Sequence, residues 1–231
     1  LMALLVLHPG GIERGRLQTA LFPDANLRNG GNHFRQIAFK FRQITGLSLH
    51  RREGNLVGLP PNALVESDDL RCEELLRATS WVTGDDRVTR LRSALERVQG
   101  AYLSGSDLEW AEERRNHLDV VQEEARLELV RLLLELGLPE EARDECEAVL
   151  LANRYSDPGY RLLVQIEQII GSESSVLAAY RRAVVALEEL GLSPGDARHL
   201  LEGPPATQAG TRAPGAGGLR SGAGRGALVS R

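Results

Sequence analysis

Hydrophobic side chains recur along most of this chain three or four residues apart, which is the spacing of helices that bury one face. Beyond residue 66 this spacing predicts successive helices at about 67–81, 86–99, 107–136, 139–153, 157–170 and 173–190, then a short helix from Pro194. Residues that favour helix starts occupy the predicted N-cap positions Ser67, Asp85, Ser106, Asp157 and Ser172. Glycines that favour helix ends follow at Gly100, Gly137, Gly171 and Gly191. This part of the chain is therefore predicted to be all helix.

The first 65 residues show a different pattern. Helices are predicted at 2–7, at about 13–22 and over the segment NHFRQIAFKFRQITG, with a loop rich in Asn and Gly at 24–31. Apolar residues then alternate at Leu47 and Leu49, stop at the polar stretch 52–55 and resume at Leu56, which predicts a β-hairpin. A helix-turn-helix followed by a hairpin is the arrangement of a winged helix.

The segment 32–46 is the candidate recognition helix. At helical spacing, Phe34, Ile37, Phe41 and Ile44 fall on one side and are expected to be buried. The residues that face away are Asn32, Arg35, Gln36, Phe39 and Gln43, with Lys40 and Arg42 on opposite flanks. Arg pairs with guanine, Asn and Gln pair with adenine, and an aromatic ring contacts a thymine methyl. Arg and Gln also favour ordinary surface helices, but the hairpin that follows favours DNA.

Part of the helical region repeats itself. LLLELGLPEEARDECEAVL and VQIEQIIGSESSVLAAYRRAV align at a displacement of 34 residues, which places Gly137 on Gly171, Ala142 on Val176 and Cys146 on Tyr180. This is the period of tetratricopeptide repeats, whose helix pairs bind peptides or other domains. The alternative is a compact acidic bundle that only holds the first domain. The expected fold class is mostly α, a winged helix-turn-helix followed by a tetratricopeptide-like repeat domain.

Charge divides the chain in the same way. Residues 1–65 carry eight basic and three acidic side chains, and residues 66–203 carry sixteen basic and twenty-nine acidic ones. Residues 204–231 carry four arginines and no acid. A basic block joined to an acidic block indicates that the first approaches a polyanion and the second does not.

The sequence offers no chemistry that would support an enzyme. GGIERGRL imitates a phosphate-binding loop, but Arg16 and Leu17 replace the Lys and the Ser or Thr that such a loop requires. The five histidines lack metal spacing, no catalytic arrangement stands out, and no cofactor is expected. Cys72 and Cys146 are isolated, as expected of a reducing cytoplasm. The apolar opening LMALLVLH is too short for a membrane span and lacks a signal-peptide pattern, so a soluble protein without membrane contact is expected.

The combination resembles the SARP-type regulators, in which an OmpR-like winged helix precedes a bacterial transcriptional activation domain of tetratricopeptide type. Trp110 with the following Glu-Arg-Arg, the long helix to Gly137, and the segment from Tyr180-Arg181-Arg182 to Pro194 carry the resemblance, which covers residues 1 to about 202. It implies a bacterial activator that binds promoter DNA, usually at directly repeated sites, and helps RNA polymerase holoenzyme engage. A homodimer on DNA stays open.

Two departures from that family are expected to matter. Family winged helices begin with a small antiparallel sheet, whereas residue 1 here already lies in the first helix, so Leu1, Leu4, Leu5 or Leu7 is expected to be partly exposed. Phe39 stands where the family more often carries a small polar residue, so base preference does not transfer.

The expected organisation is a winged-helix DNA-binding domain at 1–65, a repeat domain at 66–203 and a disordered tail at 204–231. Asn32, Arg35, Gln36, Phe39 and Gln43 would meet bases, and Lys40, Arg42, Arg51 and Arg52 would contact the backbone of double-stranded DNA. The rival hypothesis is a tetratricopeptide adaptor whose degenerate winged helix contacts only protein. The tail would either attract nucleic acid weakly or have no role.

Overall fold

The computed structural model describes residues 1–24, 27–63 and 65–193. The N-terminal region contains helices α1 (Met2–Leu7), α2 (Arg14–Leu21) and α3 (Leu27–Thr45), with the short strand β1 (Ile12–Glu13) between α1 and α2. Strands β2 (His50–Arg52) and β3 (Leu56–Gly58) follow α3. Both β1 and β2 pair with β3 in antiparallel register, so β3 is the centre of a three-stranded sheet. This arrangement confirms the predicted winged helix-turn-helix.

Three details of the N-terminal region differ from the sequence prediction. Helix α3 begins at Leu27, so most of the loop predicted at 24–31 is helix. Strand β1 was not predicted, because two residues are too few for a period-two pattern. Ile44 is 83% exposed, so its placement in the buried stripe is wrong. Ten helical steps of about 100° leave Ile44 roughly 80° away from Phe34, beyond the edge of the core.

The core of the N-terminal region joins its helices to its sheet. The buried members are Leu4 and Leu5 of α1, Ile12 of β1, Leu17 of α2, Phe34 and Phe41 of α3, and Val57 of β3. Leu1 and Leu7 are half-buried, which agrees with the expected partial exposure of α1. Trp110, from the helical region, also packs against this cluster.

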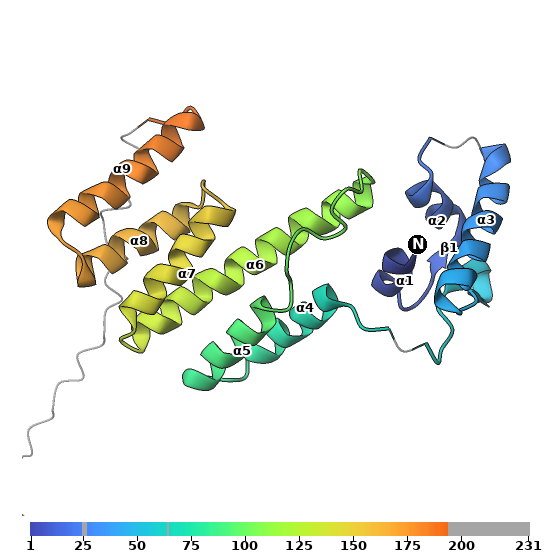
Figure 1. The fold of residues 1–231 in the computed structure, drawn as a ribbon, viewed down its shortest axis with the longest axis horizontal. Coiled ribbons are helices and arrows are strands. Elements are labelled where there is room, and N and C mark those ends of the chain that lie inside the picture. Colours follow the sequence, from blue (N-terminus) through green and yellow to red (C-terminus); the bar gives the residue numbers. More distant parts are fainter. Residues whose placement is uncertain (25–26, 64, 194–231) are drawn as a thin grey trace, which may run out of the picture.

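The helical region consists of α4 (Asp68–Thr79), α5 (Asp85–Leu95), α6 (Glu109–Glu135), α7 (Pro139–Ala152), α8 (Asp157–Ile170) and α9 (Glu173–Glu189). The bounds agree with the predicted helices to within a few residues, and the short helix predicted from Pro194 lies outside the described residues. Helices α7 and α9 begin 34 residues apart, as the repeat period requires. Figure 1 shows α6 as the longest helix, reaching from the side of the winged helix to α7 and α8.

Helix ends correct several predicted caps. Ser67 and Ser172 are N-cap residues as predicted, and Ser172 forms a full capping box with Ser175. Helices α5, α6 and α8 have Gly84, Leu108 and Ser156 as their N-cap residues, so the predictions of Asp85, Ser106 and Asp157 are wrong. These misses are one or two residues, the margin within which helix ends fray. At Gly137 and Gly191 the chain turns out of α6 and α9 with a positive φ.

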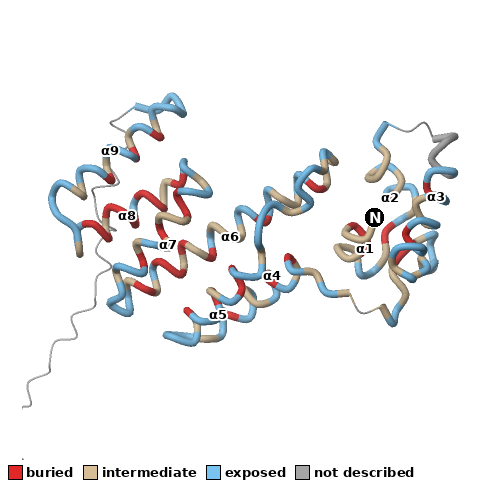
Figure 2. The backbone as a smooth tube through the Cα atoms, in the orientation of Figure 1, coloured by how far each residue is buried: buried red, intermediate tan, exposed pale blue. Residues whose placement is uncertain are grey.

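The repeat core follows the inward faces of α5 to α9 (Figure 2). Its most buried members include Leu91 of α5, Leu129 and Leu133 of α6, and Leu163 and Ile166 of α8. Helices α6, α7, α8 and α9 pack in sequence order, each against the next. Small residues on α7 and α9, Ala142 and Ala183, are fully buried and allow the helices to approach closely. The structure therefore contains the predicted tetratricopeptide-like stack.

Candidate nucleic-acid interface

Helix α3 is anchored through one face. Phe34 and Phe41 are buried two turns apart, and Ile37 packs between them at the edge of the same core. The guanidinium carbon of Arg14, from α2, lies 4.9 Å from the centre of the Phe34 ring. A cation over an aromatic face stabilises such a contact. This interaction between α2 and α3 was not predicted, since neither residue type nor spacing distinguishes it in the sequence.

The end of α3 turns the chain into the hairpin. The Thr45 hydroxyl donates to the carbonyl oxygen of Phe41 at 2.7 Å, and its oxygen accepts from the backbone N–H of Leu47 at 3.1 Å. Gly46 follows with φ +74°, a conformation that residues with a Cβ rarely adopt. The chain thus leaves α3 at Gly46, and Leu47 and Leu49 pack against the same core before the hairpin begins.

The outward face of α3 is polar and solvent-accessible. All the residues assigned to it by helical spacing are exposed: Asn32, Arg35, Gln36, Phe39, Lys40, Arg42 and Gln43. Phe39 is 62% exposed and is the aromatic ring of this face. The structure thus brings the candidate base-reading residues together on one helix face.

The hairpin of β2 and β3 forms the wing. Its turn passes through Gly54 and Asn55, which have φ values of 73° and 61°. Glycine and asparagine tolerate this left-handed region best, so the turn is tight. Arg51 is exposed, whereas Arg52 is half-buried.

The two wing arginines therefore differ in their surroundings. A Cβ added at Gly58 would lie 3.4 Å from Nε of Arg52, and one added at Gly11 would lie 3.6 Å from its Cδ. The stem of Arg52 consequently lies across the glycines of the sheet. Arg51 extends from the other face of the strand, because successive residues of a strand point to opposite faces.

The cations of this surface lack acidic neighbours. Within the described part of residues 1–65 no ion pair forms, although Glu13, Asp24 and Glu53 are present. Arg35, Lys40, Arg42 and Arg51 are therefore exposed cations without an ion-pair partner among the described residues. Unpaired cations on one surface attract a polyanion such as the DNA backbone.

No group of three or more His, Cys, Asp or Glu side chains in the described part of the chain could hold a metal ion. Of the helices that the structure describes, none has the length and hydropathy needed to cross a bilayer. Both cysteines are free and buried, and desolvation raises the pKa of the Cys146 thiol to about 12.

The structure combines a winged helix-turn-helix that has an exposed polar helix with an appended helical repeat. This combination is the architecture of a class of bacterial transcriptional regulators. The family model described as the bacterial transcriptional activator domain matches residues 69–202, more than half of the chain. The chain belongs to this family, which confirms the resemblance to SARP-type regulators that carry the same domain.

The fold of both regions is also found in a solved structure. The chain is similar to Mycobacterium tuberculosis EmbR in complex with a low affinity phosphopeptide, with a TM-score of 0.67 and 20% sequence identity. The alignment covers 83% of this chain and 54% of EmbR, so the chain spans about half the length of that protein. At this identity the likeness concerns the fold alone. No curated protein sequence matches the chain.

Proposed function

We propose that this protein is a sequence-specific DNA-binding regulator, an activator that binds duplex DNA through α3 and the wing and contacts RNA polymerase holoenzyme through the repeat region. The observation that carries the proposal is the row of exposed, unpaired cations and amides on α3 beside the exposed Arg51. Membership of the transcriptional activator family supports the same conclusion.

The proposed roles follow from position. Asn32, Arg35, Gln36, Phe39 and Gln43 meet base edges in the major groove, because they share the face of α3 opposite the core. Lys40 and Arg42 on the flanks contact phosphates, as does Arg51 on the wing. Arg52 is also proposed to contact the backbone, although its Cδ, Nε and Cζ lie over Gly11 and Gly58 of the sheet.

We also propose that residues 1–65 and 66–203 act as separate units, with 204–231 as a tail. The two hydrophobic cores support this division, because no described residue belongs to both, although Trp110 of α6 packs against the first. The charges support it too, since the first unit attracts DNA and the second, with its excess of acids, repels it.

The rival function is a protein-binding adaptor with an inactive winged helix. The affinity of the full chain for a set of random and selected duplexes, measured over a range of salt concentrations, separates the two. A DNA-binding regulator gives a log affinity that falls with log salt by about 0.9 for each phosphate contact. An adaptor binds no duplex measurably at low salt, and that result would reject the proposal.

Single variants sharpen this test. Lys40→Ala, Arg42→Ala and Arg51→Ala should each reduce the salt dependence by about one contact. Arg181→Ala is the matched control, because Arg181 is an exposed arginine on α9 without an ion-pair partner among the described residues. Equal effects of Arg181→Ala and Arg51→Ala would show that binding follows total charge and not the proposed surface.

A further inference from the structure

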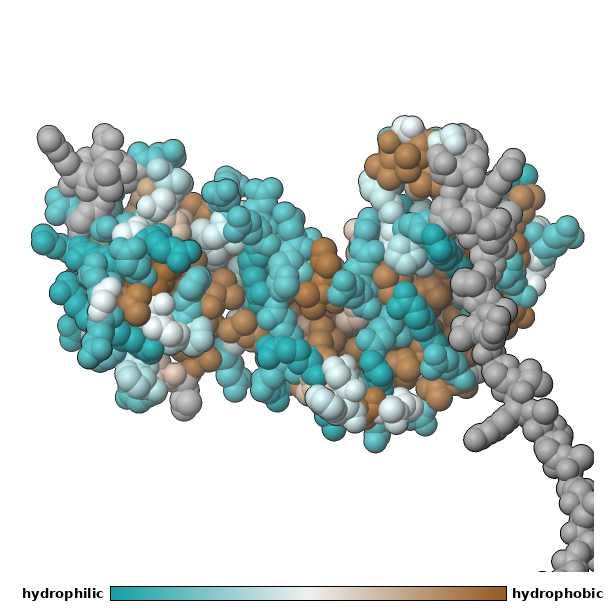
Figure 3. Space-filling view, turned by 180° about the vertical axis from the view of Figure 1, so that it is seen from behind, coloured by the Kyte–Doolittle hydropathy of each residue, from teal (hydrophilic) through white to brown (hydrophobic). Residues whose placement is uncertain are grey.

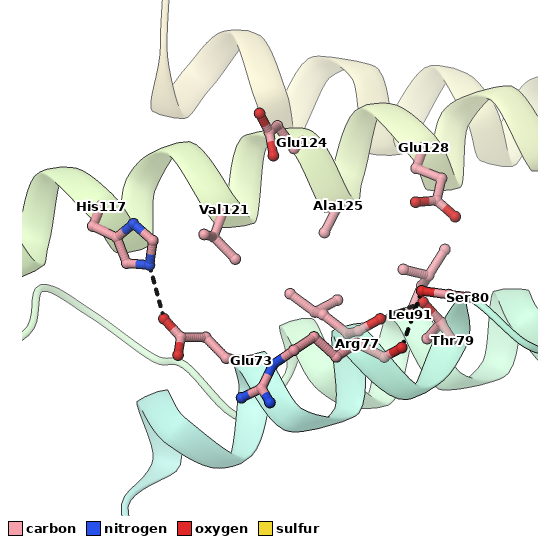
Figure 4. A pocket seen from close by; sticks show the side chains of 11 residues that line it. Glu73, Arg77, Thr79, Ser80, Leu91, His117, Val121, Glu124, Ala125 and Glu128 are labelled. Atoms are coloured by element: carbon pink, nitrogen blue, oxygen red, sulfur yellow. Dashed lines mark hydrogen bonds and ion pairs between the residues drawn. The ribbon is translucent and has the colours of Figure 1, made fainter. Parts of the chain in front are cut away.

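A groove runs between α4 and α6, with α5 beneath it. Its volume is about 430 Å³, enough for two large side chains. Figure 4 shows α4 and α6 as its two walls, with Leu91 of α5 between them. Leu76, Val121 and Ala125 complete an apolar floor. On each wall helix, the lining side chains lie on one face and point into the groove. A hydrophobic groove of this kind accepts the apolar face of an amphipathic helix.

The rim of this groove is mostly acidic. Its lining includes Glu73, Glu124 and Glu128 but only one permanently charged cation, Arg77. Glu73 and Glu128 already pair with arginines of the same region, Arg114 and Arg87. Glu124 is exposed and has no ion-pair partner among the described residues. A basic side chain on a partner would therefore find an available carboxylate at the edge of an apolar floor.

A large exposed aromatic residue comes directly after two residues that line the groove. Thr79 and Ser80 line it, and Trp81 comes immediately after them with 90% of its surface exposed. Tryptophan is seldom so exposed in a folded protein, and it is the residue most enriched among binding hot spots. Neither the repeat core nor the DNA-binding surface uses Trp81, since it belongs to neither hydrophobic cluster.

We propose that the groove between α4 and α6 is a docking site for a basic amphipathic helix of a protein partner. Apolar side chains of that helix fill the floor over Val121 and Ala125, a Lys or Arg pairs with Glu124, and Trp81 packs against its end. The excess of acids over residues 66–203 favours a basic occupant over an acidic one. This inference rests on the proposed function only in assigning protein contact to the repeat region.

The test uses the full chain without DNA, so that failure of DNA binding leaves it unaffected. The probe is a fluorescent peptide of about 18 residues, roughly five helical turns, with Leu on one face and Lys on the other. Two control peptides carry Glu in place of Lys, or the same residues in scrambled order. Fluorescence anisotropy should show binding of the first peptide and at least about tenfold weaker binding of both controls, a difference of 1.4 kcal/mol.

Matched variants distinguish the groove from charge alone. Val121→Trp fills the groove without changing charge and should weaken peptide binding about tenfold or more. Val120→Trp, one residue earlier on α6 and facing the cleft beside α7, should leave binding unchanged. Glu124→Arg should weaken binding more than Asp144→Arg, an exposed site on α7, and Trp81→Ala should weaken it about fivefold. Circular dichroism verifies that each variant is folded, and the exposed positions of Glu124 and Asp144 keep the charge test available if Val121→Trp unfolds.

Two results would overturn the proposal. Equal losses for Glu124→Arg and Asp144→Arg would show that the peptide binds the acidic surface without using the groove. Self-association of the wild-type chain that Val121→Trp abolishes, together with no peptide binding, would show that a second copy of the chain occupies the groove. Sedimentation velocity over a range of concentrations measures that outcome.

Discussion

The two regions of this protein use their arginines in opposite ways. In the repeat, arginines join neighbouring helices: Arg92 pairs with Glu141, Arg143 with Glu167 and Arg182 with Glu147. On α3 and the wing, arginines such as Arg35 and Arg51 have no acidic partner within the described residues. Paired charges fix one helix against the next, whereas unpaired charges remain available to a partner. The same residue type therefore joins helices in one region and forms the proposed binding surface in the other.

The cores differ in size as well. Seven buried residues form the core of the N-terminal region and twenty form that of the repeat, counting described residues only. Because stability rises with the apolar surface buried, the N-terminal region should be the less stable of the two. Figure 3 shows hydrophilic residues over most of the winged-helix end on the face in view and more apolar surface over the repeat.

The largest expected effect on the free energy of unfolding comes from breaking an ion-pair cluster that joins α4 to α6. Arg114 donates to Asp69 through Nε and Nη2 at 3.0 and 2.7 Å, and to Glu73 through Nη1 at 2.7 Å. Arg114→Met leaves two largely buried carboxylates without their cation and should lower the free energy of unfolding by about 3–5 kcal/mol. Urea denaturation followed by circular dichroism measures the loss. A change below about 1 kcal/mol would mean that solvent screens the cluster.

This cluster also predicts a dependence on pH. Burial acts to raise the pKa of Asp69, but hydrogen bonds from Ser67 and Arg114 outweigh it and hold that pKa below its ordinary value of 3.8. Since the folded pKa is the lower one, the ionised Asp69 stabilises the fold above pH 3.8 and loses that contribution as the pH falls further. The stability difference between the wild-type chain and Arg114→Met should therefore shrink on acidification below that pH.

Sequence patterns could not predict this cluster. Asp69 and Arg114 lie 45 residues apart, and no periodicity connects them. The helices themselves were predictable, because apolar spacing acts locally. The start of α3 was missed because residues 29–31 are an asparagine and two glycines, and each glycine disfavours helix by about 1 kcal/mol, yet α3 begins at Leu27.

The next prediction tests whether the two cores unfold independently. Leu17 in α2 and Leu129 in α6 are both fully buried, and each Leu→Ala change should cost about 2–5 kcal/mol. Leu129→Ala should lower the protection of the repeat against hydrogen exchange. Leu17→Ala should lower only the protection of the N-terminal region. Hydrogen exchange read by mass spectrometry resolves the regions. Equal loss of protection in both regions from either change would mean that they unfold as one unit.

A smaller effect concerns base readout. Arg35→Ala and Gln36→Ala should each reduce the preference for a selected operator over random duplex by about 1–3 kcal/mol, because base-edge contacts carry discrimination. Arg51→Ala should weaken binding to both duplexes alike. The assignment of the helix face would be wrong if both α3 variants left the operator preference unchanged while Arg51→Ala altered it.

The exposure of the candidate residues was predictable, but the surroundings of each were not. Helical spacing correctly placed Arg35, Gln36 and Phe39 on the outside. The same spacing placed Ile44 inside, because a pattern does not show where a helix leaves its core. The different surroundings of Arg51 and Arg52 depend on Gly11 and Gly58 meeting across the sheet, which follows from strand pairing and not from local sequence.

The smallest expected effects come from two glycines at equivalent positions of the repeat. Gly171 has an ordinary φ of −89°, but a Cβ there would overlap the side chains of Ser175 and Glu167. Gly137 has φ +74° and open space around it. Gly171→Ala should therefore cost about 1–3 kcal/mol through overpacking, and Gly137→Ala about 1 kcal/mol through backbone strain.

Asparagine distinguishes the two causes, because it tolerates the left-handed conformation but needs more room than alanine. Gly137→Asn should be less destabilising than Gly137→Ala, whereas Gly171→Asn should be at least as destabilising as Gly171→Ala. Thermal unfolding of the four variants tests this reversal. The same order of Ala and Asn at both positions would show that one cause governs both glycines, and that the repeat period preserves conformation as well as residue type.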